Sequence, residues 1–173
     1  LTGLWETPVG ELFSYTGKHY SIVDSPALPK PKQSPRPPIV IGGGGPKRTP
    51  RLAATIGAEF NLPFAPVDVW KSMCDNVRNA CAEHGRDPED LVYSVAQVAC
   101  VGANDAEVAR RAAVIGREPD ELRENGVAGT PDEAIAKIRS YADAGCDRVY
   151  LQYLTIDDLD MIELLADEVL PHV

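Results

Sequence analysis

The sequence predicts an α/β fold with a parallel sheet, and more specifically strands 5 to 8, the second half, of an eight-stranded (β/α)8 TIM barrel. Short β-branched apolar runs alternate with amphipathic helical segments over residues 38–173, which is typical of right-handed βα units. Strands are expected near residues 38, 59, 92 and 148. Four such units make half of a barrel, and alone they would leave two unpaired sheet edges. We therefore expect the first half of the barrel to be absent from this sequence.

Length and charge limit the classes of function. The chain has 173 residues and a net charge of −9, and no Lys/Arg cluster is longer than two residues, so no nucleic acid partner is expected. No apolar run approaches the roughly 20 residues of a membrane span. The four cysteines form no CxxC pair and the three histidines are scattered, which argues against a metal site and favours free thiols in a reducing cytoplasm. A small-molecule substrate as partner is compatible with these limits.

Residues 1–37 are expected to form an irregular insertion or lid before a half-barrel over residues 38–173. Residues 12–15 and 19–23 read as two short extended pieces around Gly17. Six prolines between Pro26 and Pro38 exclude a helix there. A lid over a barrel mouth and a disordered linker both stay open. The chain begins at Leu1 with neither an initiator Met nor a signal peptide, which we interpret as a start inside a longer polypeptide.

The glycine-rich stretch over residues 37–62 is the best candidate for a binding site. An apolar run over residues 38–41, typical of a strand buried on both faces, leads into four glycines and a basic pair. Thr49 is expected to cap the following helix, with Pro50 at its first position and Gly57 at its end. Open backbone N–H groups, the helix dipole and two cations together favour a phosphate. The predicted cofactor-binding residues are Gly42, Gly43, Gly44, Gly45, Lys47 and Arg48.

Two familiar phosphate-binding motifs fit this stretch poorly. In a P-loop, Lys and Ser/Thr follow the last glycine directly, whereas other residues interrupt that order here. In the dinucleotide fingerprint, Gly42 and Gly44 fit and Glu59 falls near the ribose-binding acid, but Lys47 replaces the third glycine. An NAD(P)-binding Rossmann domain stays open as a weaker alternative.

The remaining residues continue the alternation of strands and helices. Apolar spacing predicts helices over residues 67–84, from 104 or 105 to 113, and over 157–169, with strands over 91–101 and 147–154. One or two helical turns are expected around residues 120–123. The clearest local signal is the capping box of Thr130 and Glu133, with Pro131 at the first helical position. Its helix is expected to end at Gly145.

Three segments in this order resemble a known family. They are IVIGGGGPKRTPRLAATIGAEFN (39–61), the strand over residues 91–101, and GTPDEAIAKIRSYADAGCDRVYL (129–151). Together they resemble the C-terminal half of the bacterial luciferase-like flavin and deazaflavin oxidoreductases, and most closely an actinobacterial subgroup that uses coenzyme F420. The resemblance covers about residues 37–171.

This resemblance implies a luciferase-like barrel with the coenzyme ring at the C-terminal ends of the strands. The coenzyme phosphate would lie on Gly43, Gly44 and Gly45. Lys47 and Arg48 would reach the phosphate or the acidic tail of F420, or would simply be solvated. The implied chemistry is hydride transfer between an organic substrate and F420, with an FMN-dependent monooxygenase as the alternative.

The resemblance assigns no catalytic residue, because the family's first four strands carry much of its ring-binding and catalytic machinery. Asn61 and Gln152, near strand ends, are candidates for lining the pocket, with plain solvation as the alternative. Where the family often has Ala-Asp, this chain has Ala58 and Glu59. A half-barrel is expected to pair with the missing N-terminal half or to form a homo-oligomer. A bare scaffold that is catalytically incomplete without a partner also stays open.

Overall fold

The structure, a computed structural model, describes all 173 residues and divides the chain into two compact units, Leu1–Pro38 and Ile39–Val173. The first unit contains helix α1 (Thr2–Glu6) and an antiparallel hairpin of β1 (Phe13–Thr16) and β2 (Ser21–Ser25). The hairpin confirms the two extended pieces expected around Gly17, whereas α1 adds a short helix to a segment predicted to be irregular. No helix in either unit has the length and apolar character needed to span a membrane.

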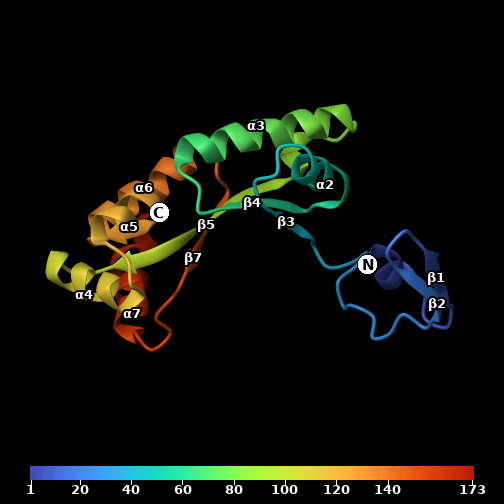
Figure 1. Ribbon diagram of the computed structural model, residues 1–173, viewed down its shortest axis with the longest axis horizontal. Helices are drawn as coiled ribbons and strands as arrows, with labels where there is room; N and C mark the ends of the chain where they lie inside the picture. Colours follow the sequence, from blue (N-terminus) through green and yellow to red (C-terminus); the bar gives the residue numbers. More distant parts are fainter. The chain divides into compact units, whose positions relative to one another are not determined.

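Four parallel strands form the sheet of the second unit. The strands β3 (Val40–Gly42), β4 (Glu59–Pro63), β5 (Val92–Val101) and β7 (Arg148–Gln152) lie side by side in this order (Figure 1). This order confirms the prediction of four consecutive parallel strands. A fifth strand, β6 (Val127–Gly129), pairs with the last residues of β5. The sequence analysis does not predict β6, because three residues carry too little pattern.

Six helices belong to the second unit. They are α2 (Arg48–Ile56), α3 (Val67–Glu83), α4 (Asp105–Ile115), α5 (Pro119–Asn125), α6 (Pro131–Asp143) and α7 (Leu159–Glu168), with short 3-10 turns at Pro88–Asp90 and Leu170–His172. The start of α2 corrects the prediction: Lys47 rather than Thr49 is the N-cap, and the helix begins at Arg48 rather than Pro50. Proline at the third position is tolerated because the first N–H groups of a helix have no partner within it.

Helices cover one face of the sheet at β3, β4 and the start of β5 (Figure 1). Phe60 of β4 and Val95 of β5 pack there against Ala53 of α2, Trp70 of α3 and Tyr141 of α6, and all five are buried. Farther along β5, one cluster includes residues of α4 and α5, and another includes residues of α6 and α7. The sheet is therefore anchored from its helical side.

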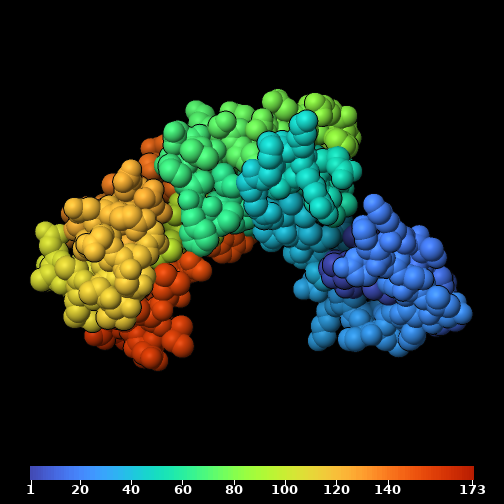
Figure 2. Space-filling model, viewed as in Figure 1, coloured from blue at the N-terminus to red at the C-terminus, as the bar shows by residue number.

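The opposite face of the sheet is uncovered along β3 and β7. Val40 is 50% exposed and Tyr150 is 41% exposed, and the space-filling view shows the second unit hollowed on this side (Figure 2). The prediction of a strand buried on both faces over residues 38–41 is therefore wrong here. β3 is an edge strand, and two of its three residues are exposed.

Candidate functional site

Gly42 is the last residue of β3, and Gly43, Gly44 and Gly45 form the turn at the carboxyl end of that strand. Gly43 has a φ of +115° and donates its N–H to the Asn61 carbonyl at 3.1 Å, which ties the turn to β4. This φ is accessible without strain mainly to glycine. Gly44 and Gly45 are exposed, and a Cβ on Gly44 would meet one atom within 4 Å, a Leu62 methyl at 3.5 Å. The backbone at Gly44 is thus open to a ligand.

Helix α2 begins just after this turn with an uncompensated positive end. No side chain caps α2 and its first turn has no acidic residue, whereas α4, α6 and α7 all have acidic first turns and side-chain caps. Lys47 and Arg48 add two exposed cations at the same end. The structure therefore brings the predicted residues together where unpaired N–H groups and positive charge favour an anion.

A cavity of about 390 Å³ lies between the glycine turn and α3. Gly44 lines it on one side, and α3 contributes the Asp68 carboxylate, the Ser72 hydroxyl and the Asn76 amide. Asp68 is the one charged residue in this lining, which otherwise holds apolar and neutral polar residues, so a phosphate that contacts the turn would lie away from this carboxylate. An anion is expected on the side of the turn that carries the basic pair.

Four side chains form a polar cluster on the uncovered face of the sheet. The Ser94 hydroxyl donates to Glu59 Oε1 at 2.6 Å and accepts from Asn61 Nδ2 at 2.9 Å, while Arg148 Nη1 donates to Glu59 Oε2 at 2.5 Å. Glu59 is only 5% exposed. Both oxygens of Glu59 are engaged, which argues against its use as a ribose-binding acid. The Asn61 amide is likewise committed to Ser94.

A second cavity, of about 420 Å³, opens at the carboxyl ends of β4, β5 and β7. Its lining residues are Phe64, Val98, Arg117, Glu121, Asn125, Gln152 and Leu154. Gln152 thus lines a cavity, as its place near a strand end suggests, whereas the other polar lining residues and Phe64 are not predicted from the sequence: Arg117, Glu121 and Asn125. The hydrogen bonds between Arg117 and Glu121 lower the pKa of the carboxyl and raise the pKa of the guanidinium. This pair therefore stays charged near neutral pH, and the lowered pKa makes the Glu121 carboxylate a weaker base than an ordinary one.

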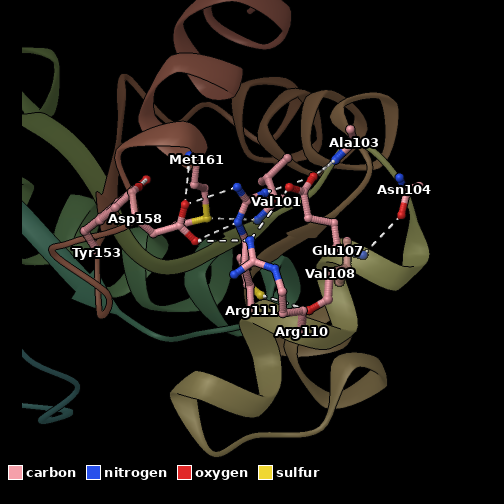
Figure 3. Close-up of polar contacts among 11 residues, drawn as sticks. Val101, Ala103, Asn104, Glu107, Val108, Arg110, Arg111, Tyr153, Asp158 and Met161 are labelled. Atoms are coloured by element: carbon pink, nitrogen blue, oxygen red, sulfur yellow. Dashed lines mark hydrogen bonds and ion pairs between the residues drawn. The ribbon is translucent and has the colours of Figure 1, made fainter.

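A buried arginine fixes the elements around this strand end (Figure 3). Arg111 of α4 is 1% exposed, and its Nε and Nη2 donate to the two carboxylate oxygens of Asp158 at 2.8 and 3.1 Å. Its Nη1 donates to the Val101 carbonyl at 2.6 Å, and Asp158 also accepts from the Met161 N–H. The hydrogen bond from Arg111 is the main cause that lowers the pKa of Asp158. Helix α4, the end of β5 and the start of α7 are thereby locked together.

The segment between β7 and α7 lines a third cavity. This cavity, of about 690 Å³, has the carboxylates of Asp157, Asp158 and Asp160 and the guanidinium of Arg110 in its wall. Three carboxylates at the start of α7 already complement the helix dipole. A phosphate is therefore disfavoured at α7, in contrast to α2.

The four cysteine thiols are the remaining candidates for reactive groups. No three His, Cys, Asp or Glu side chains converge closely enough to hold a metal ion. All four cysteines are free. Burial raises the pKa of the Cys74 thiol to about 12 and also raises the pKa of the other three thiols. These thiols therefore stay protonated near neutral pH.

The chain shares sequence and fold with one family of enzymes. Residues 1–126 match the profile of the family described as luciferase-like monooxygenase, a range that includes the first unit, which the sequence resemblance leaves out. The fold is similar to that of an F420-dependent secondary alcohol dehydrogenase in complex with an F420–acetone adduct, with a TM-score of 0.78 and 17% identity over 96% of this chain and 57% of that chain.

Two further solved structures extend this comparison. The coenzyme F420 dependent tetrahydromethanopterin reductase from Methanopyrus kandleri has a TM-score of 0.78 and 18% identity over 99% of this chain and 60% of that chain. The oxygenating constituent of 3,6-diketocamphane monooxygenase from Pseudomonas putida, in complex with FMN, has a TM-score of 0.69 and 18% identity over 99% of this chain and 60% of that chain. The chain therefore spans less than two thirds of the length of these structures.

Proposed function

The chain belongs to the luciferase-like monooxygenase family, and from this premise we propose that it supplies strands 5 to 8 of a (β/α)8 barrel that transfers hydride between an organic substrate and coenzyme F420. FMN is the alternative coenzyme. The residues proposed to hold the coenzyme phosphate are Gly42, Gly43, Gly44, Gly45, Lys47 and Arg48.

The start of α2 is the observation that supports this proposal most strongly. It is the place in the second unit where an open glycine backbone, an uncapped helix N-terminus and two exposed cations coincide. The carboxyl ends of β3 and β4 lie side by side, so a phosphate held at the turn would place the rest of a coenzyme near the mouth of the barrel. Active sites of this fold occupy that mouth.

The sequence resemblance is the ground for proposing F420 over FMN, and the structural neighbours include both F420-dependent proteins and one in complex with FMN. When bound, F420 supplies hydride transfer at C5 of its ring, whereas FMN would supply oxygen activation. The chain's own residues bind and orient the coenzyme: the turn after β3 fixes the phosphate, and the apolar side chains of Val98 in β5 and Leu154 after β7 help to exclude water from the mouth.

We also propose that the open face of the sheet is covered in the working protein by the other four strands of the barrel or by a second copy of the chain. β3 and β7 each pair with a strand on one side only, and Val40 and Tyr150 are exposed on the inner face. Unpaired parallel edges are otherwise prone to association. The molar mass in solution tests this, because a well-folded, monodisperse monomer of 173 residues would contradict it.

Fluorescence titration with matched ligand pairs tests the phosphate site. F420 is compared with FO, which has the same ring without the phosphate, and FMN is compared with riboflavin. We expect the phosphorylated member of one pair to bind at least about tenfold more tightly, which corresponds to roughly 1.4 kcal/mol. The Gly44→Ala variant should lose most of this ratio, because its methyl group blocks close approach to the backbone.

Charge variants separate the site from a general electrostatic effect. The Lys47→Ala/Arg48→Ala variant should lower the same affinity ratio. Lys71→Ala removes an exposed lysine of α3 and should leave the ratio unchanged. Equal binding of both members of each pair by the wild-type protein would contradict the phosphate site.

A further inference from the structure

The turn after β4 holds an aromatic residue in an unfavourable backbone conformation. Phe64 has a φ of +55°, in the left-handed region that bulky residues rarely adopt. Its side chain is nevertheless 51% exposed, so burial of the ring in the core does not compensate for this conformation. Strained residues of this kind persist where their surroundings fix them, and they cluster at ligand sites.

Buried groups fix the backbone on both sides of Phe64. Its N–H donates to the Ala96 carbonyl at 2.8 Å. The carbonyl of the next residue, Ala65, accepts from the Tyr141 hydroxyl at 2.6 Å and from Gln97 Nε2 at 2.8 Å. Both of these side chains are buried. The turn is therefore held by β5 and α6, and its conformation does not depend on any contact of the phenyl ring.

The phenyl ring lines the cavity of about 420 Å³ at the carboxyl ends of β4, β5 and β7. Val98 and Leu154 extend its apolar wall, and the amides of Asn125 and Gln152 lie at the same cavity together with the Arg117–Glu121 ion pair. The volume is in the range of small-molecule sites. An aromatic face beside amide groups fits a flat conjugated ring that carries carbonyl and N–H groups on its edge.

We propose that Phe64 contacts the coenzyme ring, and that the strained turn presents its phenyl face to a flavin or deazaflavin ring whose edge hydrogen-bonds the Gln152 amide. This inference rests on the proposed function. It separates a ring subsite after β4 from a phosphate subsite after β3, so the two can be tested independently.

Ring-only ligands test this assignment on the 173-residue chain in its solution assembly. FO and lumiflavin carry the ring without a phosphate. Phe64→Ala and Phe64→Gly should weaken their binding roughly tenfold, whereas Phe64→Tyr, which keeps the aromatic face, should bind within about twofold of wild type. Leu170→Ala removes an exposed apolar side chain near the C-terminus and should change nothing. The F420-to-FO affinity ratio should stay constant in all four variants.

Stability distinguishes a ligand contact from a structural role. Glycine adopts a positive φ without strain, so Phe64→Gly should resist urea at least as well as wild type. A loss of stability in Phe64→Gly together with unchanged ring binding would overturn the inference and make Phe64 structural.

The remaining outcomes separate this inference from the proposed function. Unchanged FO and lumiflavin binding in Phe64→Ala, with the F420-to-FO ratio intact, overturns the ring contact alone. An effect confined to the KM of the organic substrate also overturns it and assigns Phe64 to the substrate. A wild-type protein that binds the rings but shows no phosphate-dependent ratio overturns the phosphate site alone. Absence of binding to any of these ligands overturns both.

Discussion

Arg111 and Asp158, which are 47 residues apart in the sequence, form a bidentate ion pair with Nε–Oδ2 and Nη2–Oδ1 distances of 2.8 and 3.1 Å (Figure 3). The guanidinium is 1% exposed and also reaches the last carbonyl of β5, at Val101. This pair joins α4 to the start of α7, so it determines where the segment after β7 lies. That segment borders the mouth of the proposed barrel.

Removing Arg111 should be far more costly than removing its neighbour Arg110. The variant Arg111→Met leaves the Asp158 carboxylate without its main partner, and breaking such a buried pair costs about 3–5 kcal/mol of unfolding free energy. Arg110 is 57% exposed, with ion-pair distances of 3.7 and 3.8 Å, so Arg110→Ala should cost less than about 1 kcal/mol. Urea denaturation at pH 7 measures both. Similar losses in the two variants would contradict the role of the buried pair.

The same pair predicts how stability depends on pH. The hydrogen bond from Arg111 lowers the pKa of Asp158 in the folded protein, so the folded state binds fewer protons here than the unfolded state does. Its contribution is present above the unfolded pKa of about 3.9 and is lost as pH falls through the folded value. The stability difference between wild type and Asp158→Asn should therefore shrink as pH falls below about 4. A difference that stays constant from pH 7 to pH 3 would argue against this coupling.

The buried carboxylate of Glu59 should depend on Arg148. Arg148→Ala removes the charged partner at 2.5 Å and leaves a carboxylate that is 5% exposed, which should cost about 1–3 kcal/mol. Glu59→Gln removes the charge and allows the hydrogen bond with Ser94 to remain. The double variant Glu59→Gln/Arg148→Ala should therefore lose less unfolding free energy than the two single variants lose in total. Strict additivity in thermal or urea unfolding would show that the two residues are not coupled.

Two adjacent glycines should respond differently to alanine. Gly43 has a φ of +115°, so Gly43→Ala should lose roughly 1–2 kcal/mol of stability through backbone strain. At Gly44 an added Cβ would make an ordinary van der Waals contact with Leu62, so the unfolding free energy of Gly44→Ala should stay within about 0.5 kcal/mol of wild type. Urea unfolding of the two variants checks this difference. A large loss in Gly44→Ala would remove its value as a probe of the phosphate site.

Periodicity and local chemistry predict much of this fold. The apolar stripe of α3 and the long apolar run of β5 predict the bounds of these two elements to within a residue or two of the bounds in the structure. The capping box is confirmed, because the Glu133 carboxylate accepts from both the N–H and the hydroxyl of Thr130. These signals are local, and the residues that carry them need no distant partner.

The missed features depend on contacts between segments far apart in the sequence. Arg111 lies on the buried stripe of α4 with Val108 and Ala112. From the sequence alone a charged side chain at this position is expected to be exposed, because its partner Asp158 is distant in the sequence. Phe64 lies between two prolines, and nothing local indicates its positive φ, which Ala96 and Tyr141 help to fix. Helix α2 begins at Arg48, two residues before the start at Pro50 that the Thr-Pro pair predicts.

Amide NMR of the glycine turn tests the central claim most directly. Selective ¹⁵N-glycine labelling makes the N–H signals of Gly43, Gly44 and Gly45 observable during titration with F420 and, separately, with FO; FMN and riboflavin serve as the second pair. We expect the Gly44 and Gly45 signals to shift with the phosphorylated member of one pair and to stay in place with its phosphate-free counterpart. Binding of F420 or FMN without any shift at these glycines would contradict the phosphate site.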